Sequence, residues 1–148
     1  MCGIVGSGKS TLARDLARGL PALRLSRDEW MLRLYGSAYD DPAYVAALAP
    51  CTELLWDIAA GALAAGASVV LDWNHWSRER RADSLARCQK LGVAMSLHYV
   101  DVPVDTAILR ALSRTDDLSH RLDEAGVRHS AAILEPPTDD EGFVVLRH

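Results

Sequence analysis

The sequence contains few of the residues and segments that mark secreted, zinc-binding or membrane-spanning proteins. Its three cysteines, Cys2, Cys51 and Cys88, are widely spaced and form no C-x-x-C pair, which argues against a disulfide framework and a zinc site. We expect buried or incidental thiols in a reducing compartment. The most apolar run, residues 58–71, has 14 residues and is too short to span a membrane. No targeting segment is visible, so the sequence predicts a cytoplasmic protein.

The sequence also has no large excess of charge of either sign. The chain carries 16 basic and 20 acidic residues, a formal net charge of −4, which argues against general nucleic-acid or membrane-surface binding. A local basic site, or the binding of a short oligonucleotide, is compatible with this balance. With 148 residues, 49% of them hydrophobic, we expect one domain, residues 1–148, with a sizeable core. The sequence indicates no oligomeric state.

The most specific pattern lies at the start, where residues 3–10 have the sequence GIVGSGKS and match the phosphate-binding pattern G-x-x-x-x-G-K-[ST]. The glycines let the backbone turn tightly and direct its N–H groups at an anion, and a helix that opens near Lys9 adds its positive end. Lys9 is expected to reach the β- and γ-phosphates, and the Ser10 hydroxyl to ligate Mg²⁺. The pattern therefore predicts binding of a nucleoside triphosphate. The residues expected to bind it are Gly3, Gly6, Ser7, Gly8, Lys9, Ser10 and Thr11.

A phosphate-binding loop of this kind is expected to have a strand before it and a helix after it, and the sequence clearly predicts only the helix. Leucines at 12, 16 and 20 repeat with helical spacing, and Gly19 with Pro21 marks a stop, so a helix follows the loop. Only Met1 and Cys2 precede Gly3, whereas a buried parallel strand usually has about five residues. Either the first strand is reduced to a stub, or the true start of the protein lies upstream. The alternative for the loop itself is a glycine-rich turn without a ligand.

Strand and helix patterns alternate through the rest of the chain. A continuous apolar run at residues 68–72 is typical of a buried parallel strand. The alternation predicts an α/β protein with a parallel sheet and helices on both faces. In such sheets the ligand lies at the carboxyl ends of the strands, where the loop, Asp28, Asp72 and Asp101 all fall. We expect strands at residues 22–26, 68–72, 93–100 and 143–146, and helices after the loop, from Asp28 onward, and at 44–65, 78–90 and 104–113.

Together these segments resemble the small P-loop kinases of the AAA-type ATP-binding domain family, relatives of the 5′-kinase of polynucleotide kinase, zeta toxin and chloramphenicol phosphotransferase. The resemblance covers almost the whole chain. It implies a three-layer P-loop NTPase sandwich with a mainly parallel sheet, its first strand truncated here, and an ATP-dependent kinase that uses Mg²⁺. The segments that carry the resemblance are GIVGSGKST, LSRDEW, VVLDWNHWSRERR, LRALSR and EPPTDDEG.

The resemblance assigns roles to two carboxylates. Asp28 would be the general base that accepts the proton of the substrate hydroxyl, although Asp is also a favoured helix cap. Asp72 would hold Mg²⁺ through water, or position the acceptor together with Asn74, although Asp-Trp-Asn also suits a plain turn. Near the end of the chain, residues 135–137 would either border the adenine or form a simple stiff turn.

Two arginines four residues apart, Arg110 and Arg114, share one face of a predicted helix. In the resembling kinases such a pair leads into a lid, expected here around residues 114–128, and neutralises charge on the transferred phosphoryl group. Arg121 and Arg128 are further candidates from this segment. The alternative is a set of exposed salt bridges with nearby aspartates. The second arginine is followed by Thr rather than by the Asn usual in the family, which leaves the start of the lid open.

Aromatic and basic side chains crowd the segment after the buried strand. Trp73, His75 and Trp76 would either pack the strand end or stack on a substrate, and for His75 packing is the favoured interpretation. Of the arginines at 78, 80 and 81, one could face the site, and most are expected to lie on a solvated helix face.

The sequence leaves the phosphate acceptor open. The resembling kinases phosphorylate nucleic-acid 5′-hydroxyls, sugars, nucleotide sugars and antibiotics, and the net acidity of this chain favours a small molecule. No guanine-binding N-K-x-D motif is present, so the preference for ATP rests on the resemblance. The competing hypotheses are a nucleotide-binding regulator without phosphotransfer and a catalytically silent, truncated homologue.

Overall fold

The structure is a computed structural model that describes residues 1–36, 41–113 and 123–148. Arg114, Arg121 and the expected start of the lid lie outside the described residues. The chain forms two compact units, which we describe one at a time. Within the described part, the first unit comprises residues 1–12, 74–113 and 123–148, and the second comprises residues 13–36 and 41–73.

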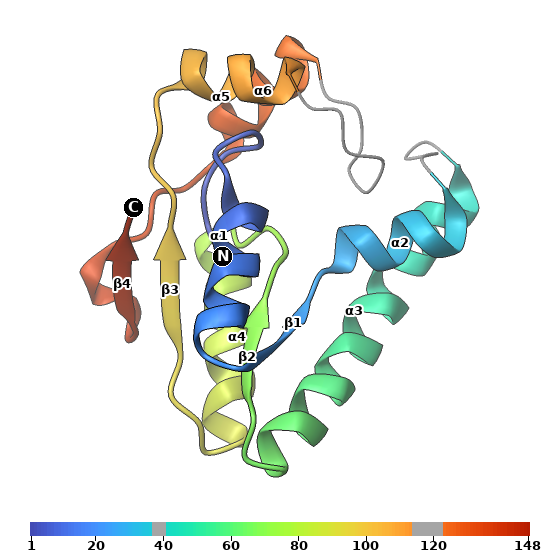
Figure 1. The fold of residues 1–148 in the computed structure, drawn as a ribbon, viewed down its shortest axis with the longest axis vertical. Helices are drawn as coiled ribbons and strands as arrows, with labels where there is room; N and C mark the ends of the chain where they lie inside the picture. Colours follow the sequence, from blue (N-terminus) through green and yellow to red (C-terminus); the bar gives the residue numbers. More distant parts are fainter. Residues whose placement is uncertain (37–40, 114–122) are drawn as a thin grey trace. The chain divides into compact units, whose positions relative to one another are not determined.

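The first unit contains a parallel pair of strands, β3 (Ser96–Tyr99) and β4 (Val144–Arg147), which run side by side in Figure 1. The chain start adds to β3 a single parallel bridge between Cys2 and Tyr99. The Cys2 amide donates to the His98 carbonyl, and the Cys2 carbonyl accepts from the amide of the residue after Tyr99, both at 2.9 Å. The expected first strand is therefore a stub of two residues held by one bridge.

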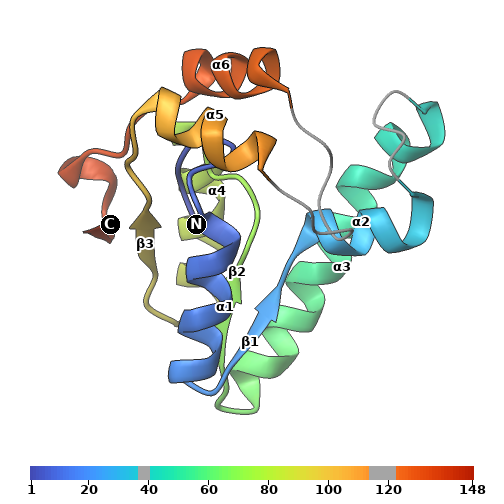
Figure 2. The same ribbon diagram turned by 45° about the horizontal axis from the view of Figure 1, so that its top comes forward.

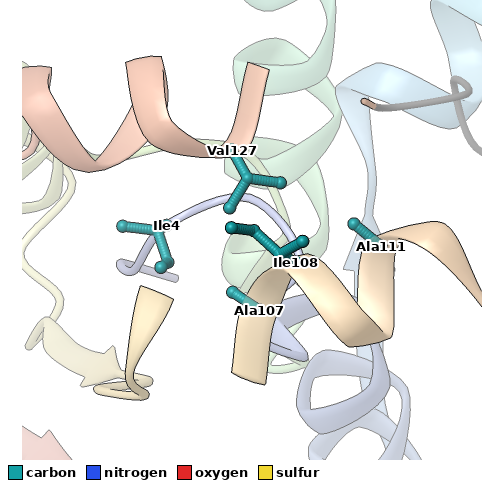
Figure 3. Packing of buried hydrophobic residues seen from close by; sticks show 5 residues of the cluster. All are labelled: Ile4, Ala107, Ile108, Ala111 and Val127. Atoms are coloured by element: carbon teal, nitrogen blue, oxygen red, sulfur yellow. The ribbon is translucent and has the colours of Figure 1, made fainter. Parts of the chain in front are cut away.

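Helices of the first unit enclose the segment that follows the stub. Helix α5 (Val104–Leu112) packs against α6 (Glu124–Ile133), and both views show the two helices side by side (Figures 1 and 2). Between them lies a cluster of buried apolar side chains (Figure 3). Because one member comes from the loop at residues 3–10, that loop is anchored in the core of the unit. The cluster consists of Ile4, Ala107, Ile108, Ala111 and Val127.

Helix α4 (Arg78–Lys90) is tied to the loop before β4 by buried ionic contacts. The side chain of Arg81 is 1% exposed and that of Glu141 is 3% exposed, and two hydrogen bonds of 2.6 and 2.8 Å join them. Arg81 also donates to the carbonyl of Glu135 at 2.9 Å. The expectation of a solvated face is thus wrong for Arg81. The helix turns this side chain toward the 3-10 turn at Asp139–Glu141, where a carboxylate offsets the cost of burying its charge.

The second unit is built on another parallel pair, β1 (Ala22–Leu25) and β2 (Ser68–Leu71). Helix α3 (Pro42–Ala64) contacts both strands, and α2 (Arg27–Tyr35) packs on α3. Strand β2 is not fully buried as expected: Ser68 is exposed and the other three residues are half-buried. In the described part of the chain β1 is its one strand partner. Helix α1 (Lys9–Gly19) starts at the loop of the first unit and continues into the second.

One helix of the described residues is long and apolar enough to cross a membrane, by length and composition alone. It is α3, with 23 residues, a mean hydropathy of 1.3 and 22% of its most apolar window buried. Core helices of soluble proteins pass the same test, so the observation is weak evidence for a membrane span.

The expected alternation of strands and helices is confirmed. All described strand pairs are parallel, and the chain is an α/β protein. The largest difference is at β3, where four residues are extended instead of the eight expected at residues 93–100. The three cysteines are free and buried, as expected, and burial raises the pKa of each thiol.

Removal of Glu141 should reveal how much the buried ion pair stabilises the first unit. We expect Glu141→Ala to lower the free energy of unfolding by about 3–5 kcal/mol, because Arg81 then keeps a desolvated charge without its partner. Asp139→Ala is the matched control in the same turn: its side chain is exposed, and the change should stay within about 0.5 kcal/mol. Denaturant unfolding at pH 7 measures both, and equal losses would contradict the assignment.

The same pair predicts a pH dependence. Burial acts to raise the pKa of Glu141, but the hydrogen bonds from Arg81 and the Thr138 amide, together with the charges of Arg81 and Arg78, outweigh it and hold the pKa below its ordinary value. A carboxyl group with a depressed folded-state pKa adds stability that is complete above its unfolded pKa and is lost as the pH falls. The stability difference between wild type and Glu141→Ala should therefore shrink below about pH 4.

Candidate functional site

The loop at residues 3–10, which we call the phosphate loop, is shaped by glycines that other residues cannot replace. Gly3 has a φ of 134°, and a Cβ there would lie 2.5 Å from the carbonyl oxygen of Val100. Gly6 has a φ of 81°, and its Cβ would collide with the carbonyl oxygen of Ala107. Both positions combine a left-handed backbone with close approach to another backbone, which only glycine permits. The loop is thus pressed against the end of β3 and the start of α5.

Three side chains hold the phosphate loop in this shape. The Val5 amide donates to the Ser130 hydroxyl of α6 at 3.1 Å, and that hydroxyl donates onward within its own helix. Arg110 of α5 donates from Nη1 to the carbonyl of Ser7 at 2.8 Å. Lys9 folds back so that its Nζ donates to the Ile4 carbonyl at 2.7 Å. The structure therefore places Lys9 and Arg110, two expected catalytic residues, on the phosphate loop.

The interior of the loop suits an anion. The Ser7 side chain is 1% exposed, and its hydroxyl oxygen has no hydrogen-bond partner within the described part of the chain. A Cβ on Gly8 would meet one atom within 4 Å, Nη1 of Arg110 at 3.7 Å. Helix α1 begins at Lys9, so its positive end faces the loop. The phosphates of a nucleotide fit such a site. They would accept a hydrogen bond from the Ser7 hydroxyl, fill the space beside the Arg110 guanidinium and face the start of α1.

The stub before the loop is fixed by His75, which is 3% exposed. The Met1 carbonyl accepts from the backbone N of His75 and from its ring Nδ1, both at 3.3 Å. On the other side of the ring, Nε2 lies 2.9 Å from the Ser84 hydroxyl. Because a carbonyl can only accept, Nδ1 must carry a proton to bond to Met1. His75 is therefore buried, as the packing interpretation expects, and it also makes hydrogen bonds through its ring.

In the second unit, Asp28 and Asp72 follow the carboxyl ends of the paired strands β1 and β2. Ser26 caps α2, accepting from the Glu29 amide at 3.5 Å, so Asp28 is in the first turn but is not the cap. Its side chain is 48% exposed. The simple capping alternative for Asp28 is therefore wrong, and its role as general base stays a prediction.

Asp72 belongs to a charged cluster that the sequence analysis missed. Its Oδ2 accepts from Nε and Nη2 of Arg24 at 2.9 and 2.6 Å, and its side chain is 3% exposed. Arg24 also makes a bidentate pair with Glu29, at 2.6 and 3.2 Å. Burial acts to lower the pKa of Arg24, but hydrogen bonds to Glu29 and Asp72 raise it above its ordinary value. Asp72 is therefore partly neutralised by Arg24, and its role toward Mg²⁺ stays a prediction.

The sequence carried a signal for some of the missed residues. Arg24 is a basic residue inside an apolar run that forms a strand, and such a residue needs a carboxylate partner nearby. No local pattern distinguishes Ser130, whose contact with Val5 spans 125 positions. Thr11 lies in the first turn of α1 and is exposed, and Ser10 beside it is half-buried.

Comparison with known proteins gives a consistent result. A protein-family model described as an AAA domain matches residues 1–137. A search of curated proteins found no match.

Several solved structures have the same fold. A sugar kinase from Janibacter sp. HTCC2649, in an unliganded structure, is 20% identical, with a TM-score of 0.66 over 99% of this chain and 82% of that chain. A gluconokinase from Sinorhizobium meliloti 1021 is 17% identical, with a TM-score of 0.62 over 99% and 79%. A proposed kinase from Chloroflexus aurantiacus J-10-fl is 19% identical, with a TM-score of 0.71 over 99% and 82%. At these identities the likeness establishes the fold, which is that of P-loop kinases.

Gly6→Ala tests the shape of the phosphate loop. The added methyl group would press on the Ala107 carbonyl from a left-handed backbone, so we expect the loop to shift and nucleotide affinity to fall by at least about tenfold. Gly19→Ala is the control, because a Cβ there meets no atom within 4 Å. Equilibrium titration with ADP and Mg²⁺ measures both, and unchanged affinity of Gly6→Ala would contradict the geometry.

His75→Asn and His75→Gln test the hydrogen bond to the stub. Asn places an N–H near the position of Nδ1, whereas Gln places it near Nε2. We expect His75→Asn to keep nucleotide affinity and His75→Gln to weaken it about 3- to 10-fold, the effect of one lost hydrogen bond. Thermal unfolding of both variants separates this effect from general loss of packing. Equal affinities would show that the ring acts by packing alone.

Proposed function

The chain belongs to the AAA domain family, and we propose that it is an ATP-dependent kinase that transfers the γ-phosphate to a hydroxyl group. The observation that carries the proposal is the phosphate loop, where Lys9 and Arg110 both bond to loop carbonyls beside the buried Ser7 hydroxyl. Two cations beside one loop suit the charge of a triphosphate.

The proposed roles divide between binding and charge stabilisation. Backbone N–H groups of the loop and the start of α1 would bind the phosphates, and Lys9 would leave the Ile4 carbonyl to contact the β- and γ-phosphates. Ser10 and Asp72 are the residues proposed to hold Mg²⁺, which when bound would offset negative charge on the phosphate oxygens. Arg110 and Arg114 would stabilise charge on the transferred group.

Asp28 is the proposed general base. It would orient the acceptor hydroxyl and take its proton as the hydroxyl oxygen bonds to the γ-phosphorus. The bond between that phosphorus and the β,γ-bridging oxygen breaks, and ADP leaves. The exposure of Asp28 supports this role, since its carboxylate is accessible to a substrate. Most of the rate acceleration would come from positioning and electrostatics.

We propose a small-molecule acceptor. Two of the structural neighbours are named as a sugar kinase and a gluconokinase, and the net charge of −4 disfavours nucleic acid. A 5′-hydroxyl oligonucleotide is the alternative acceptor. A cytoplasmic location, a single domain over residues 1–148 and a lid around 114–128 belong to the same proposal.

Asp28→Asn tests the chemistry. We expect ADP release that depends on an acceptor to fall about 10²- to 10⁴-fold, while nucleotide affinity stays unchanged, because the amide cannot accept the proton. The acceptor panel comprises sugars, sugar acids, nucleosides, aminoglycoside and chloramphenicol-type alcohols and a 5′-hydroxyl oligonucleotide. Asp57→Asn on the exposed side of α3 is the control and should behave as wild type.

Lys9→Ala separates binding from transfer. We expect it to weaken binding of ATP with Mg²⁺, because the phosphates lose their lysine. Nucleotide binding by wild type without transfer to any acceptor would favour a regulator, and no nucleotide binding at all would favour a silent homologue.

A further inference from the structure

The side chain of Arg27, the first residue of α2, is half-buried. Its side chain is 16% exposed, and its Nε is buried and unpaired within the described residues. Its one ionic contact in that part of the chain is with the neighbouring Asp28, and the distance of 3.8 Å from Nε to Oδ1 is too long for a hydrogen bond.

Arg24 in the same unit shows how unusual this is. The Arg24 side chain is 15% exposed, almost the same as Arg27, yet it donates four hydrogen bonds to Asp72 and Glu29. A guanidinium group carries five N–H donors in a planar fork, and leaving them unpaired away from water is costly. Within the described residues the cost of an unpaired buried N–H arises at Nε of Arg27, whereas Nε of Arg24 donates to Asp72.

The surroundings of Arg27 strengthen any charge interaction there. Tyr44 and Cys51 of α3 are 1% and 7% exposed, and the charges of Arg27 and Asp28 both act on them. Burial, and then the Asp28 carboxylate, raises the pKa of Tyr44 against the opposing effect of Arg27. Arg27 also stands in the first turn of α2, where the helix favours a negative ligand.

We propose that Arg27 binds an oxyanion of the acceptor, so that the substrate is a small alcohol bearing a carboxylate or phosphate group. The inference rests on the proposed function, with Asp28 as the base. Nε of Arg27 and Oδ1 of Asp28 are 3.8 Å apart, and each reaches a partner at about 3 Å, so the oxyanion and the reacting hydroxyl lie within about 10 Å of each other. Hydroxy acids and sugar phosphates meet this limit.

Matched ligand pairs test the charge requirement. With the phosphate loop saturated by a non-hydrolysable ATP analogue and Mg²⁺, so that the γ-phosphate position is filled, titrations compare gluconate with glucose, glycerate with glycerol, and glucose 6-phosphate with glucose. Sulfate serves as an oxyanion probe that does not depend on the identity of the acceptor. For wild type we expect at least one charged member to bind about tenfold more tightly than its neutral partner, and sulfate to bind.

Arg27→Gln should remove this preference and the sulfate binding, without weakening the neutral ligands. Arg27→Lys should retain part of it, because lysine keeps the charge but not the fork. Arg33→Gln, an exposed arginine on the same helix, is the control and should equal wild type. Without ligand, the thermal unfolding midpoint of Arg27→Gln should equal or exceed that of wild type, because a buried N–H that has no hydrogen-bond partner in the described part of the chain is removed.

The outcomes separate this inference from the proposed function. The inference would be overturned if Arg27→Gln left the binding of sulfate and of sugar acids unchanged. It would also be overturned if this variant unfolded at a clearly lower temperature than wild type. Phosphorylation of the oligonucleotide alone would overturn the small-molecule assignment. Binding of an acid through Arg27 without any phosphate transfer would leave the inference standing and refute the kinase.

Discussion

The close approach of the phosphate loop to two backbone carbonyls is the constraint on which the first unit depends. With Gly3 against Val100 and Gly6 against Ala107, the loop has no room to move toward β3 or α5. Ile4 then falls into the cluster between α5 and α6, and Arg110 of α5 reaches the Ser7 carbonyl. The packing of α5 on α6 and the shape of the phosphate loop therefore depend on each other, because a shift of α5 would disturb the packing and displace the loop.

The buried charges of the molecule follow two different rules. Arg81 and Arg24 are each paired with carboxylates in short, bidentate contacts, which offsets their desolvation and fixes the segments they join. Arg27 is nearly as buried as Arg24, but its Nε has no hydrogen-bond partner within the described residues, and its one ionic contact there is with Asp28 at 3.8 Å. Structural arginines are satisfied by the chain itself, whereas an arginine that binds a ligand must keep its donors available, and burial then strengthens the interaction with an incoming anion.

The sequence was sufficient for features that depend on neighbours along the chain. The phosphate loop, the helix that starts at Lys9, the strand at 68–71 and the α/β class follow from local spacing and alternation. Contacts between distant positions did not follow: no pattern distinguished Arg81 from Arg78 and Arg80 as the buried arginine, and Ser130 carried no signal. A charged residue on an amphipathic helix has the same pattern whether it points to water or to a carboxylate 60 positions away, as Glu141 is from Arg81.

The placement of the proposed site residues explains how one frame could serve many acceptors. The nucleotide-binding residues depend on glycine backbones and core packing in the first unit, so substitutions there disturb folding and binding together. Asp28 and Arg27 are adjacent side chains on the first turn of α2, a helix capped independently by Ser26. Side chains on a turn that Ser26 already caps can change with little cost to the helix. Selection for a new acceptor can therefore act on the turn after β1, while the phosphate loop stays as it is.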